Sequence, residues 1–339
     1  MKAIELAENG LLPYWLLRMG IRKRVGNKLS IEQSKSTEDQ LNFTKRLASS
    51  PIAQDTEAAN TQHYEVPTVF YQYALGPHLK YSSAYWPEGC TTLADAEQAA
   101  LELIEKRVEL SNGQSVLDLG CGWGSFSLWA APRFPQSTFL AVSNSHTQAT
   151  FIREEATKRG IENLVVVTQD INAFNPQQQF DRIVSVEMLE HVRNYESLFA
   201  RIASWMHQDT KMFVHVFSHR KFAYAYDADN PNEWMAKYFF TGGIMPSHAL
   251  LPSFDNHLKM EKSWLLDGTH YQKTSNAWLD NMNAHQDEIR ELFKETYGSD
   301  NATRWMWRWR LFFLSCAELF GYKNGSEWGV SHYILRKQA

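Results

Sequence analysis

Cysteine is scarce in this sequence, and neither an excess of positive charge nor a long apolar run is present. Its 339 residues include three cysteines that form no C-x-x-C pair, so neither a disulfide framework nor a zinc site is expected. A formal net charge of −4 disfavours nucleic acid as a partner. No stretch reaches the roughly 20 apolar residues of a membrane span. The N-terminal apolar run is broken by Arg18, unlike a secretory leader, so a cytoplasmic protein is expected.

A basic, partly apolar helix is predicted near the N-terminus. Its apolar residues include Leu11, Trp15 and Leu17, and basic residues recur from Arg18 to Lys28. Such a helix either rests on a membrane surface or packs on the protein core. We favour packing through its Leu and Trp side, so membrane contact is not expected.

Short apolar runs alternate with helical patterns after residue 113. The runs are "SVLDLG", "STFLAVS", "NLVVVTQD", "FDRIVSVE" and "KMFVHVFS", and "LKMEKSWLL" and "GVSHYILRK" follow later. This alternation is typical of an α/β fold whose largely parallel sheet is covered on both faces. Thr91 or Thr92 is placed to cap the preceding helix, "TTLADAEQAALELIEKRVEL".

The segment "SVLDLGCGWGSFSLWAA" joins a strand to a helix through a glycine-rich turn. Asp118 precedes Gly120, Gly122 and Gly124 in a D-x-G-x-G-x-G pattern, which differs from the G-x-G-x-x-G of dinucleotide sites. Glycines at such a turn let the backbone approach a ligand, and helix N-terminal amides bind its polar end. A nucleotide-type cofactor at the carboxyl end of the first strand is therefore predicted.

Polar residues also follow the next two strands. Asn144, in "AVSNS", can both donate to and accept from ribose hydroxyls. Asp170 can accept from an adenine amine while Ile171 packs on the ring, or it can instead cap a turn or helix. The residues alone leave these two roles for Asp170 open.

The stretch "VSVEMLEHVRNYES" places Glu187, Glu190 and His191 at positions i, i+3 and i+4. If a helix begins near Glu187, all three lie on one face. A zinc site is disfavoured, because position 187 lacks the first histidine of H-x-x-E-H. Acidic residues in a first helical turn can also be purely structural.

An aromatic-rich region lies between His215 and the last strand, and helices over the carboxyl end of the sheet are expected there. Most of its rings belong to the core, but a few suit a cationic or planar substrate. The residues chosen for a substrate pocket are Phe217, Trp234, Tyr238 and Tyr271.

Nearly the whole chain resembles the coclaurine N-methyltransferases, which use S-adenosylmethionine (SAM) and are related to cyclopropane fatty acid synthases. The resemblance rests on segments such as "KYSSAYW", "LDLGCGWGSFSLWAA", "SVEMLEHVRNY" and "YFFTGGIMPS". It implies a class I methyltransferase fold, a Rossmann-like and mostly parallel seven-stranded sheet. The N-terminal helical region is expected over 1–90 and the core over 91–339, with helical cap insertions at about 220–255 and 270–325.

The resemblance also implies roles for individual residues. Asp118 and Gly122 of the turn are expected at the SAM site. The other residues expected to contact SAM are Tyr81, Ser82, Gly120, Asn144, Gln148, Asp170 and Ile171. Glu187, Glu190 and His191 would face the methyl acceptor. The glutamates would then bind an ammonium group, and His191 would accept or relay its proton. The predicted reaction is methyl transfer to the nitrogen of a small aromatic or cyclic amine, with no metal.

A cyclopropane-synthase-like reaction on unsaturated phospholipid chains is the alternative. By resemblance, the bicarbonate pocket of those enzymes would map onto Ser83, Glu190, His215, Phe217 and Tyr271. They typically have Cys at the first position and Ile at the fourth, and they lack a carboxylate at position 187. These departures favour an amine pocket. A SAM-binding protein without catalysis and a dehydrogenase are weaker alternatives, and a homodimer is compatible with the sequence.

Overall fold

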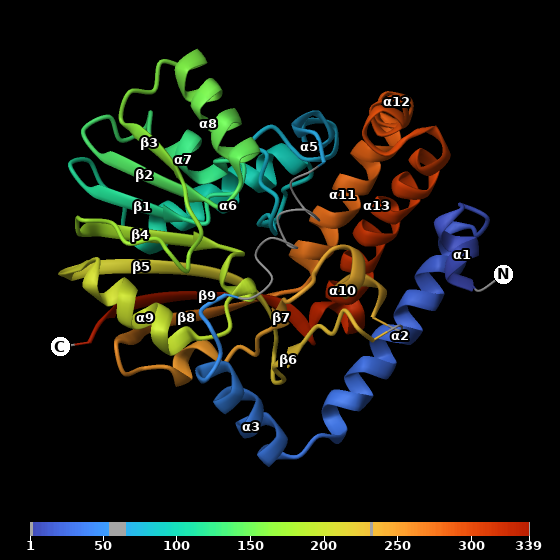
Figure 1. The fold of residues 1–339 in the computed structure, drawn as a ribbon, viewed down its shortest axis with the longest axis horizontal. Coiled ribbons are helices and arrows are strands. Elements are labelled where there is room, and N and C mark those ends of the chain that lie inside the picture. The colour runs from blue at the N-terminus through green and yellow to red at the C-terminus, as the bar shows by residue number, and fades with distance from the viewer. Residues whose placement is uncertain (1–2, 54–65, 231–232, 339) are drawn as a thin grey trace.

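The computed structural model describes residues 3–53, 66–230 and 233–338. Its main element is a seven-stranded sheet of order β3-β2-β1-β4-β5-β9-β8 (Figure 1). The strands are β1 (Ser115–Leu119), β2 (Thr138–Ser143), β3 (Leu164–Thr168), β4 (Phe180–Val186), β5 (Met206–His219), β8 (Leu258–Asp267) and β9 (Trp328–Lys337). The pairs from β3 to β5 are parallel, and β9 pairs antiparallel with both β5 and β8. The predicted strands and the mostly parallel sheet are confirmed.

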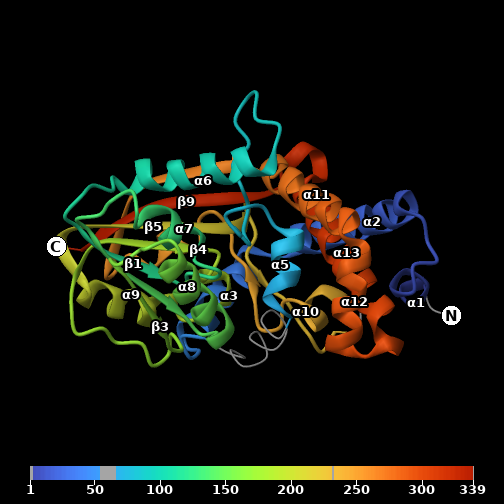
Figure 2. The ribbon, with the colours of Figure 1, turned by 90° about the horizontal axis from the view of Figure 1, so that it is seen from above.

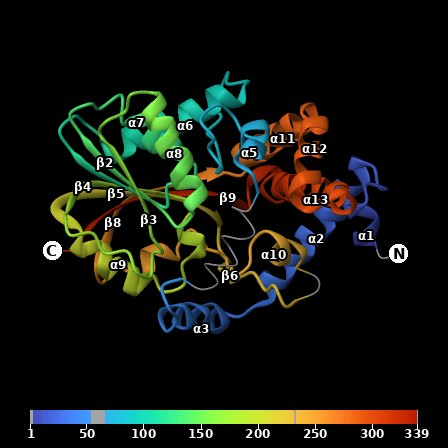
Figure 3. The same ribbon diagram turned by 45° about the horizontal axis from the view of Figure 1, so that its top comes forward.

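Helices cover both faces of this sheet because its strands alternate two sets of buried side chains. On one face lie α6 (Leu93–Val108) and α7 (Ser125–Ala130), which pack on residues such as Val116 and Phe213, and α8 (His146–Lys158), which packs on Ala141 and Val166. On the other lies α9 (Tyr195–Ser204), which packs on Leu117 and Met212. Figure 3 shows α8 and α9 on opposite sides of the strands, and Figure 2 shows α6 running along β9. The Thr92 hydroxyl accepts from the Asp95 backbone N–H, so Thr92 is the N-cap of α6.

A helical layer stands beyond one end of the sheet (Figure 1). It contains α11 (Thr269–Ala284), α12 (Gln286–Tyr297) and α13 (Ser299–Phe320), with α5 (Thr68–Ala74) and α10 (Trp234–Tyr238) beside them. Smaller elements are the two-stranded pair β6 (Tyr224–Ala225) and β7 (Ile244–Met245) and the 3-10 turns η1 (Leu189–His191), η2 (Leu251–Ser253) and η3 (Tyr322–Gly325). An aromatic cluster that includes Trp278 and Trp309 joins these helices to one another.

The N-terminal helices are α1 (Ala3–Glu8), α2 (Tyr14–Ser34) and α3 (Thr37–Ala48). Helix α2 packs on the core through Leu17, Val25 and Leu29, as predicted for its leucine side. Arg18 and Arg22 add ion pairs with the buried Glu318 of α13. The prediction was wrong for Trp15, which is 64% exposed. In the described ranges, no helix is both long and apolar enough to cross a membrane.

Candidate active site

A cavity of about 230 Å³ opens between the carboxyl ends of β1, β2 and β4 and the helices α11 and α13. Strand order reverses direction at β1, and the crevice at such a point is where open α/β sheets bind ligands. Both the glycine-rich turn and Glu187 line it. The predicted cofactor site and acceptor site thus share one cavity.

The glycine-rich turn keeps the cavity open beside β1. Gly120 has φ +80°, and a Cβ built there would lie 2.5 Å from Cγ of Met188. Gly122 has φ +54° and also lines the cavity, but a Cβ there would meet nothing within 4 Å. Asp118 is buried beneath the turn, where it accepts from Ser127 Oγ at 2.6 Å, and burial raises its pKa to about 6.

Every residue predicted to contact SAM lies on the cavity wall. Gln148 accepts at Oε1 from Ser143 Oγ at 2.8 Å, which holds the start of α8 against β2. Asp170 accepts at Oδ1 from the Asn172 backbone N–H at 2.7 Å, so it does cap a turn. That bond uses one oxygen of the carboxylate, and a ligand contact through the other remains compatible with it.

The residues that fit a nucleoside cofactor line the cavity together with the glycine-rich turn. Asn144 and Asp170 follow β2 and β3, and Ser82 reaches the cavity from the loop before α6. Ser125, which the sequence analysis missed, also lines it, and its buried Oγ has no hydrogen-bond partner among the described residues. Such an orphan hydroxyl at a helix start is free to bind a polar ligand group. The residue set therefore fits SAM.

Lys80 is a further cavity residue without a local sequence signal. Its side chain is buried, and Nζ donates to Ser82 Oγ and to the Ser83 carbonyl, each at 2.6 Å. Burial lowers the pKa of Lys80 to about 8. Lys80 fixes the loop whose next residues reach both the cofactor wall and Glu187.

Glu187 does not begin a helix, so the expected helical face was wrong. It follows the last residue of β4 with φ +47°, and the 3-10 turn η1 starts two residues later. The left-handed backbone turns the chain at once, which lets η1 pack beside β5. Glu187 and His191 nevertheless both reach the cavity wall.

Three donors converge on the buried carboxylate of Glu187. Oε1 accepts from the Ser83 backbone N–H at 2.9 Å and from His215 Nε2 at 3.0 Å. Oε2 accepts from Tyr271 Oη at 2.7 Å. Burial raises the pKa of Glu187 above its ordinary value, and the Lys80 charge and the hydrogen bonds from Ser83 and Tyr271 oppose the rise. Hydrogen bonds donated to a carboxylate favour its ionised form, so these contacts act against the effect of burial.

Glu190 does not itself line the cavity, but it contacts a residue that does. It is fully buried in η1 and accepts at Oε1 from the Phe217 backbone N–H at 2.7 Å. Its Oε2 has no hydrogen-bond partner among the described residues. Burial and the negative charge of Glu187 raise the pKa of Glu190 well above its ordinary value. The pKa of both glutamates is thus raised, but hydrogen-bond donors and Lys80 oppose the rise at Glu187, whereas the Glu187 charge adds to it at Glu190.

His191 is held neutral at the cavity wall. Its ring lies against Phe240, with ring centroids 4.8 Å apart. Burial lowers its pKa to about 4, and the Glu187 charge acts in the opposite direction. At neutral pH the imidazole is therefore uncharged.

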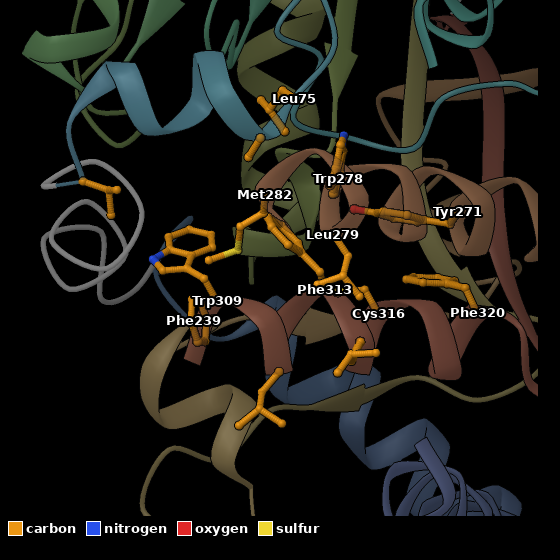
Figure 4. Packing of buried hydrophobic residues seen from close by; sticks show 14 of the residues in the cluster. Leu75, Phe239, Tyr271, Trp278, Leu279, Met282, Trp309, Phe313, Cys316 and Phe320 are labelled. Carbon is orange, nitrogen blue, oxygen red and sulfur yellow. The ribbon is translucent and has the colours of Figure 1, made fainter. Parts of the chain in front are cut away.

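Two of the four predicted pocket residues line the cavity and two do not. Phe217 and Tyr271 do, whereas Trp234 and Tyr238 are absent from its wall. Both lie on α10, which turns them outward: Trp234 Nε1 donates to Glu8, and Tyr238 packs under Arg308. The sequence analysis missed the aromatic lining residues Trp123, Phe126, Tyr226, Phe240, Trp278, Phe312 and Phe320. Figure 4 shows Tyr271 of α11 lying over Phe320 of α13.

The described part of the chain contains no cluster of metal-ligand side chains. In residues 3–53, 66–230 and 233–338, no group of three or more His, Cys, Asp or Glu side chains is arranged to hold a metal ion. The three side chains of the E-x-x-E-H stretch have different partners instead. Glu187 accepts from His215, Glu190 accepts from the Phe217 backbone, and His191 lies against Phe240.

Comparison with known proteins agrees with this geometry. The mycolic acid cyclopropane synthetase family matches residues 53–326. An (S)-coclaurine N-methyltransferase from Thalictrum flavum subsp. glaucum is 36% identical, covering 100% of this chain and 95% of that protein. The cyclopropane-fatty-acyl-phospholipid synthase of Escherichia coli K12 is 31% identical over 70% of this chain and 59% of its own length.

A solved structure extends the likeness to three dimensions. The crystal structure of a coclaurine N-methyltransferase bound to N-methylheliamine and S-adenosylhomocysteine superposes with a TM-score of 0.94 at 34% identity, covering 98% of both chains. One assignment agrees with the cavity at the carboxyl ends of the strands, with the glycine-rich turn and with the full-length similarity. The chain belongs to the coclaurine N-methyltransferase family and is a SAM-dependent methyltransferase with a class I fold.

Proposed function

We propose that this enzyme methylates the nitrogen of a small aromatic or cyclic amine. The observation that carries the proposal is the Glu187 carboxyl group, fixed by three donors in a cavity with aromatic walls. An alkylamine has a pKa of about 10 and arrives as a cation, so a fixed carboxylate provides both attraction and orientation. Phe217 and Phe240, with centroids 5.5 Å apart, offer ring faces to the same cation.

The cofactor residues proposed are those predicted from the sequence, with Ser125 added. When bound, SAM supplies an electrophilic methyl group on a sulfonium that is its own leaving group. The protein must therefore bring the nitrogen lone pair to that carbon and remove the proton that masks it. Glycine at positions 120 and 122 leaves the space in which the two ligands would meet.

His191 is the proposed proton acceptor. The amine binds as an ammonium ion beside Glu187 and transfers one proton to the neutral imidazole of His191. The freed lone pair forms the new N–C bond while the C–S bond breaks and its electrons remain on sulfur. A secondary amine leaves as a protonated tertiary amine, and the proton on His191 passes to solvent. The Glu187 charge stabilises the transient imidazolium.

The contacts of Glu187 also weigh against the lipid alternative. Three of the residues that the resemblance assigned to a bicarbonate pocket, Ser83, His215 and Tyr271, are the donors to this carboxylate. A carboxylate from the chain thus takes the hydrogen bonds that an external anion would need. This supports a reaction without bicarbonate.

The proposed domain division follows from the same cavity. Residues 1–90 form an N-terminal helical region, and 91–339 form the catalytic core. Insertions at about 220–255 and 270–325 would cap the acceptor, which is consistent with the cavity residues contributed by α11 and α13. The cytoplasmic location and the homodimer stay predictions.

Methyl transfer from isotope-labelled SAM tests the proposal. Two acceptor panels are supplied, cyclic and aromatic amines and vesicles of unsaturated phospholipid, each with and without added bicarbonate. We expect labelled N-methyl products from amines, independent of bicarbonate, and a loss of at least about a hundredfold in Glu187→Gln, because an ionic contact to the substrate is removed. Label in acyl chains, or a bicarbonate requirement, would overturn the amine assignment.

A further inference from the structure

A row of buried polar side chains runs from Glu187 away from the cavity toward α6. His215 Nδ1 lies 2.9 Å from Nε2 of His332, and His332 Nδ1 contacts the guanidinium NH1 of Arg107. Neither His215 nor His332 nor Arg107 lines the cavity. The row therefore lies outside the surfaces that cofactor and acceptor touch.

Sheet register builds this row. His215 of β5 pairs directly with His332 of β9, and His332 pairs directly with Trp264 of β8. Directly opposed residues of antiparallel strands project from the same face, so the three side chains form one line across the sheet. The last turn of α6 places Arg107 over Trp264, with its guanidinium carbon 4.1 Å from the ring centroid. This cation–π contact holds Arg107 against His332.

Arg107 fixes the direction of every hydrogen bond in the row. A guanidinium donates but cannot accept, so Nδ1 of His332 must be the acceptor and carry no proton. Neutral His332 then has its proton on Nε2 and donates to Nδ1 of His215. His215 in turn is protonated at Nε2 and donates to Glu187. The reverse tautomers would place two N–H groups against each other at Arg107.

We propose that Arg107 and His332 are positioning residues that lock His215 in the Nε2-protonated tautomer and so keep Glu187 ionised and fixed for amine binding. This rests on the proposed function. Because the row ends on a donor-only group, it cannot carry a proton away from Glu187. It acts as a one-way series of donors, and the proton released in the reaction leaves by another route.

Burial favours the neutral histidines that this arrangement requires. It lowers the pKa of His215 and of His332 well below the ordinary value, and the nearby positive charges of Lys80 and Arg107 act in the same direction. Burial lowers the pKa of Arg107 itself to about 10, which leaves it protonated at neutral pH. The titratable groups that face Glu187 are Lys80, Glu190, His191, His215, Tyr271 and Cys316.

The tautomers are measured directly by NMR on the wild-type protein with ring-¹⁵N-labelled histidine. His215→Asn and His332→Asn variants assign the two signals. We expect both rings to be neutral and Nε2-protonated between about pH 6 and pH 8. An Nδ1-protonated ring at either position overturns the proposal. This readout needs no substrate, so it stands even if no amine is methylated, and failure of the acceptor panel alone would count only against the proposed function.

Arg107→Met and Arg107→Lys test the consequence for catalysis. Met keeps an apolar chain over Trp264 but removes the donor, so His332 should adopt mixed tautomers and Glu187 should lose support for its charge. We divide kcat/KM of the variant by that of the wild type at each pH, so that the titration of the amine itself cancels. Loss of the donor should move the acidic limb of the variant's pH profile to higher pH. On that limb the ratio should fall about tenfold for each pH unit of the shift. Lys restores a donor and should rescue the profile. The Kd of S-adenosylhomocysteine should not change.

Two outcomes contradict this consequence. An Arg107→Met profile that is lowered equally at every pH would show a merely structural role. If Arg107→Lys gave the same pH profile as Arg107→Met, the hydrogen-bond donor at position 107 would not be the cause of the change. Thermal unfolding of each variant confirms that folded proteins are compared, and the wild-type NMR result decides the tautomers if neither variant folds.

Discussion

Tyr271 of α11 donates its hydroxyl to Oε2 of Glu187 at 2.7 Å, so a helix beyond the sheet completes a carboxylate site that begins at the end of β4. The phenol ring stacks on Phe320 of α13, with centroids 4.2 Å apart and planes 15° apart. Helix α11 therefore supplies one of the three donors to the Glu187 carboxyl group from outside the sheet.

Tyr271→Phe separates this donor from the stacking. The ring contact with Phe320 is kept, and the hydrogen bond to Glu187 is lost, so kcat/KM for the amine should fall about ten- to a hundredfold, as expected for a bond to a charged group. SAM affinity, measured by titration calorimetry, should remain within error. Tyr73→Phe, which removes a phenol outside the cavity, is the control. An equal loss in both variants would remove the special role of Tyr271.

His191→Gln should lower kcat by about a hundred- to ten-thousandfold, the range for losing a general base, with little change in SAM binding. Because the pKa of His191 is about 4, this residue should add no step to the pH–rate profile near pH 6.5. Rapid-quench measurement of the methyl-transfer step, from about pH 5 to pH 9, checks both expectations. His257→Gln, which changes a partly exposed histidine just before β8, is the control. A variant that loses SAM affinity in parallel would instead assign His191 to the cofactor site.

Local sequence signals predicted the strands, the glycine-rich turn and the Thr92 cap because each depends on neighbouring residues. The conformation of Glu187 could not be read in this way. Glutamate rarely adopts a positive φ, and here the packing of η1 against β5 imposes it. The i, i+3, i+4 spacing was therefore interpreted as a helix that the tertiary structure does not form.

Long-range pairing explains what else was missed. His215 and His332 are 117 positions apart and meet only through the register of β5 and β9. Arg107 joins them from a helix earlier in the chain. Likewise, Trp234 and Tyr238 had the residue types of a pocket, but the orientation of α10 turns them toward α1 and α13. Residue type predicted the chemistry, and contacts between distant segments decided which side chains take part.

Glu190→Gln should stabilise the fold increasingly as pH rises. The raised pKa of Glu190 means that the native state keeps a proton that the unfolded chain releases above its ordinary pKa. Wild-type stability therefore falls as pH rises through the window between the unfolded and folded values, by about 1.4 kcal/mol per pH unit at most. Glutamine is neutral throughout and can still accept from Phe217, so it lacks this loss.

Chemical denaturation of wild type and Glu190→Gln at about pH 4, 5, 6 and 7 measures the effect. The two proteins should be closest in stability at the lowest pH and furthest apart at the highest. Glu288→Gln, an exposed carboxyl on α12, serves as the control. Parallel curves for wild type and Glu190→Gln would mean that Glu190 is ionised in the native protein.

Alanine at Gly122 should weaken SAM binding selectively, and two other glycines provide the comparison. Gly122, Gly120 and Gly160 all have positive φ, so each alanine variant should lose about 1 kcal/mol of folding free energy from backbone strain. Gly120→Ala should lose more, because its Cβ would also meet Met188.

Gly122→Ala and Gly160→Ala both place a methyl group in open space, but only that of Gly122 enters the cavity. Calorimetry should therefore show a SAM Kd about tenfold higher for Gly122→Ala, roughly the effect of one steric conflict, and unchanged for Gly160→Ala. If Gly122→Ala bound SAM as tightly as Gly160→Ala does, the cofactor would not pass close to this turn, and its placement beside β1 would be wrong.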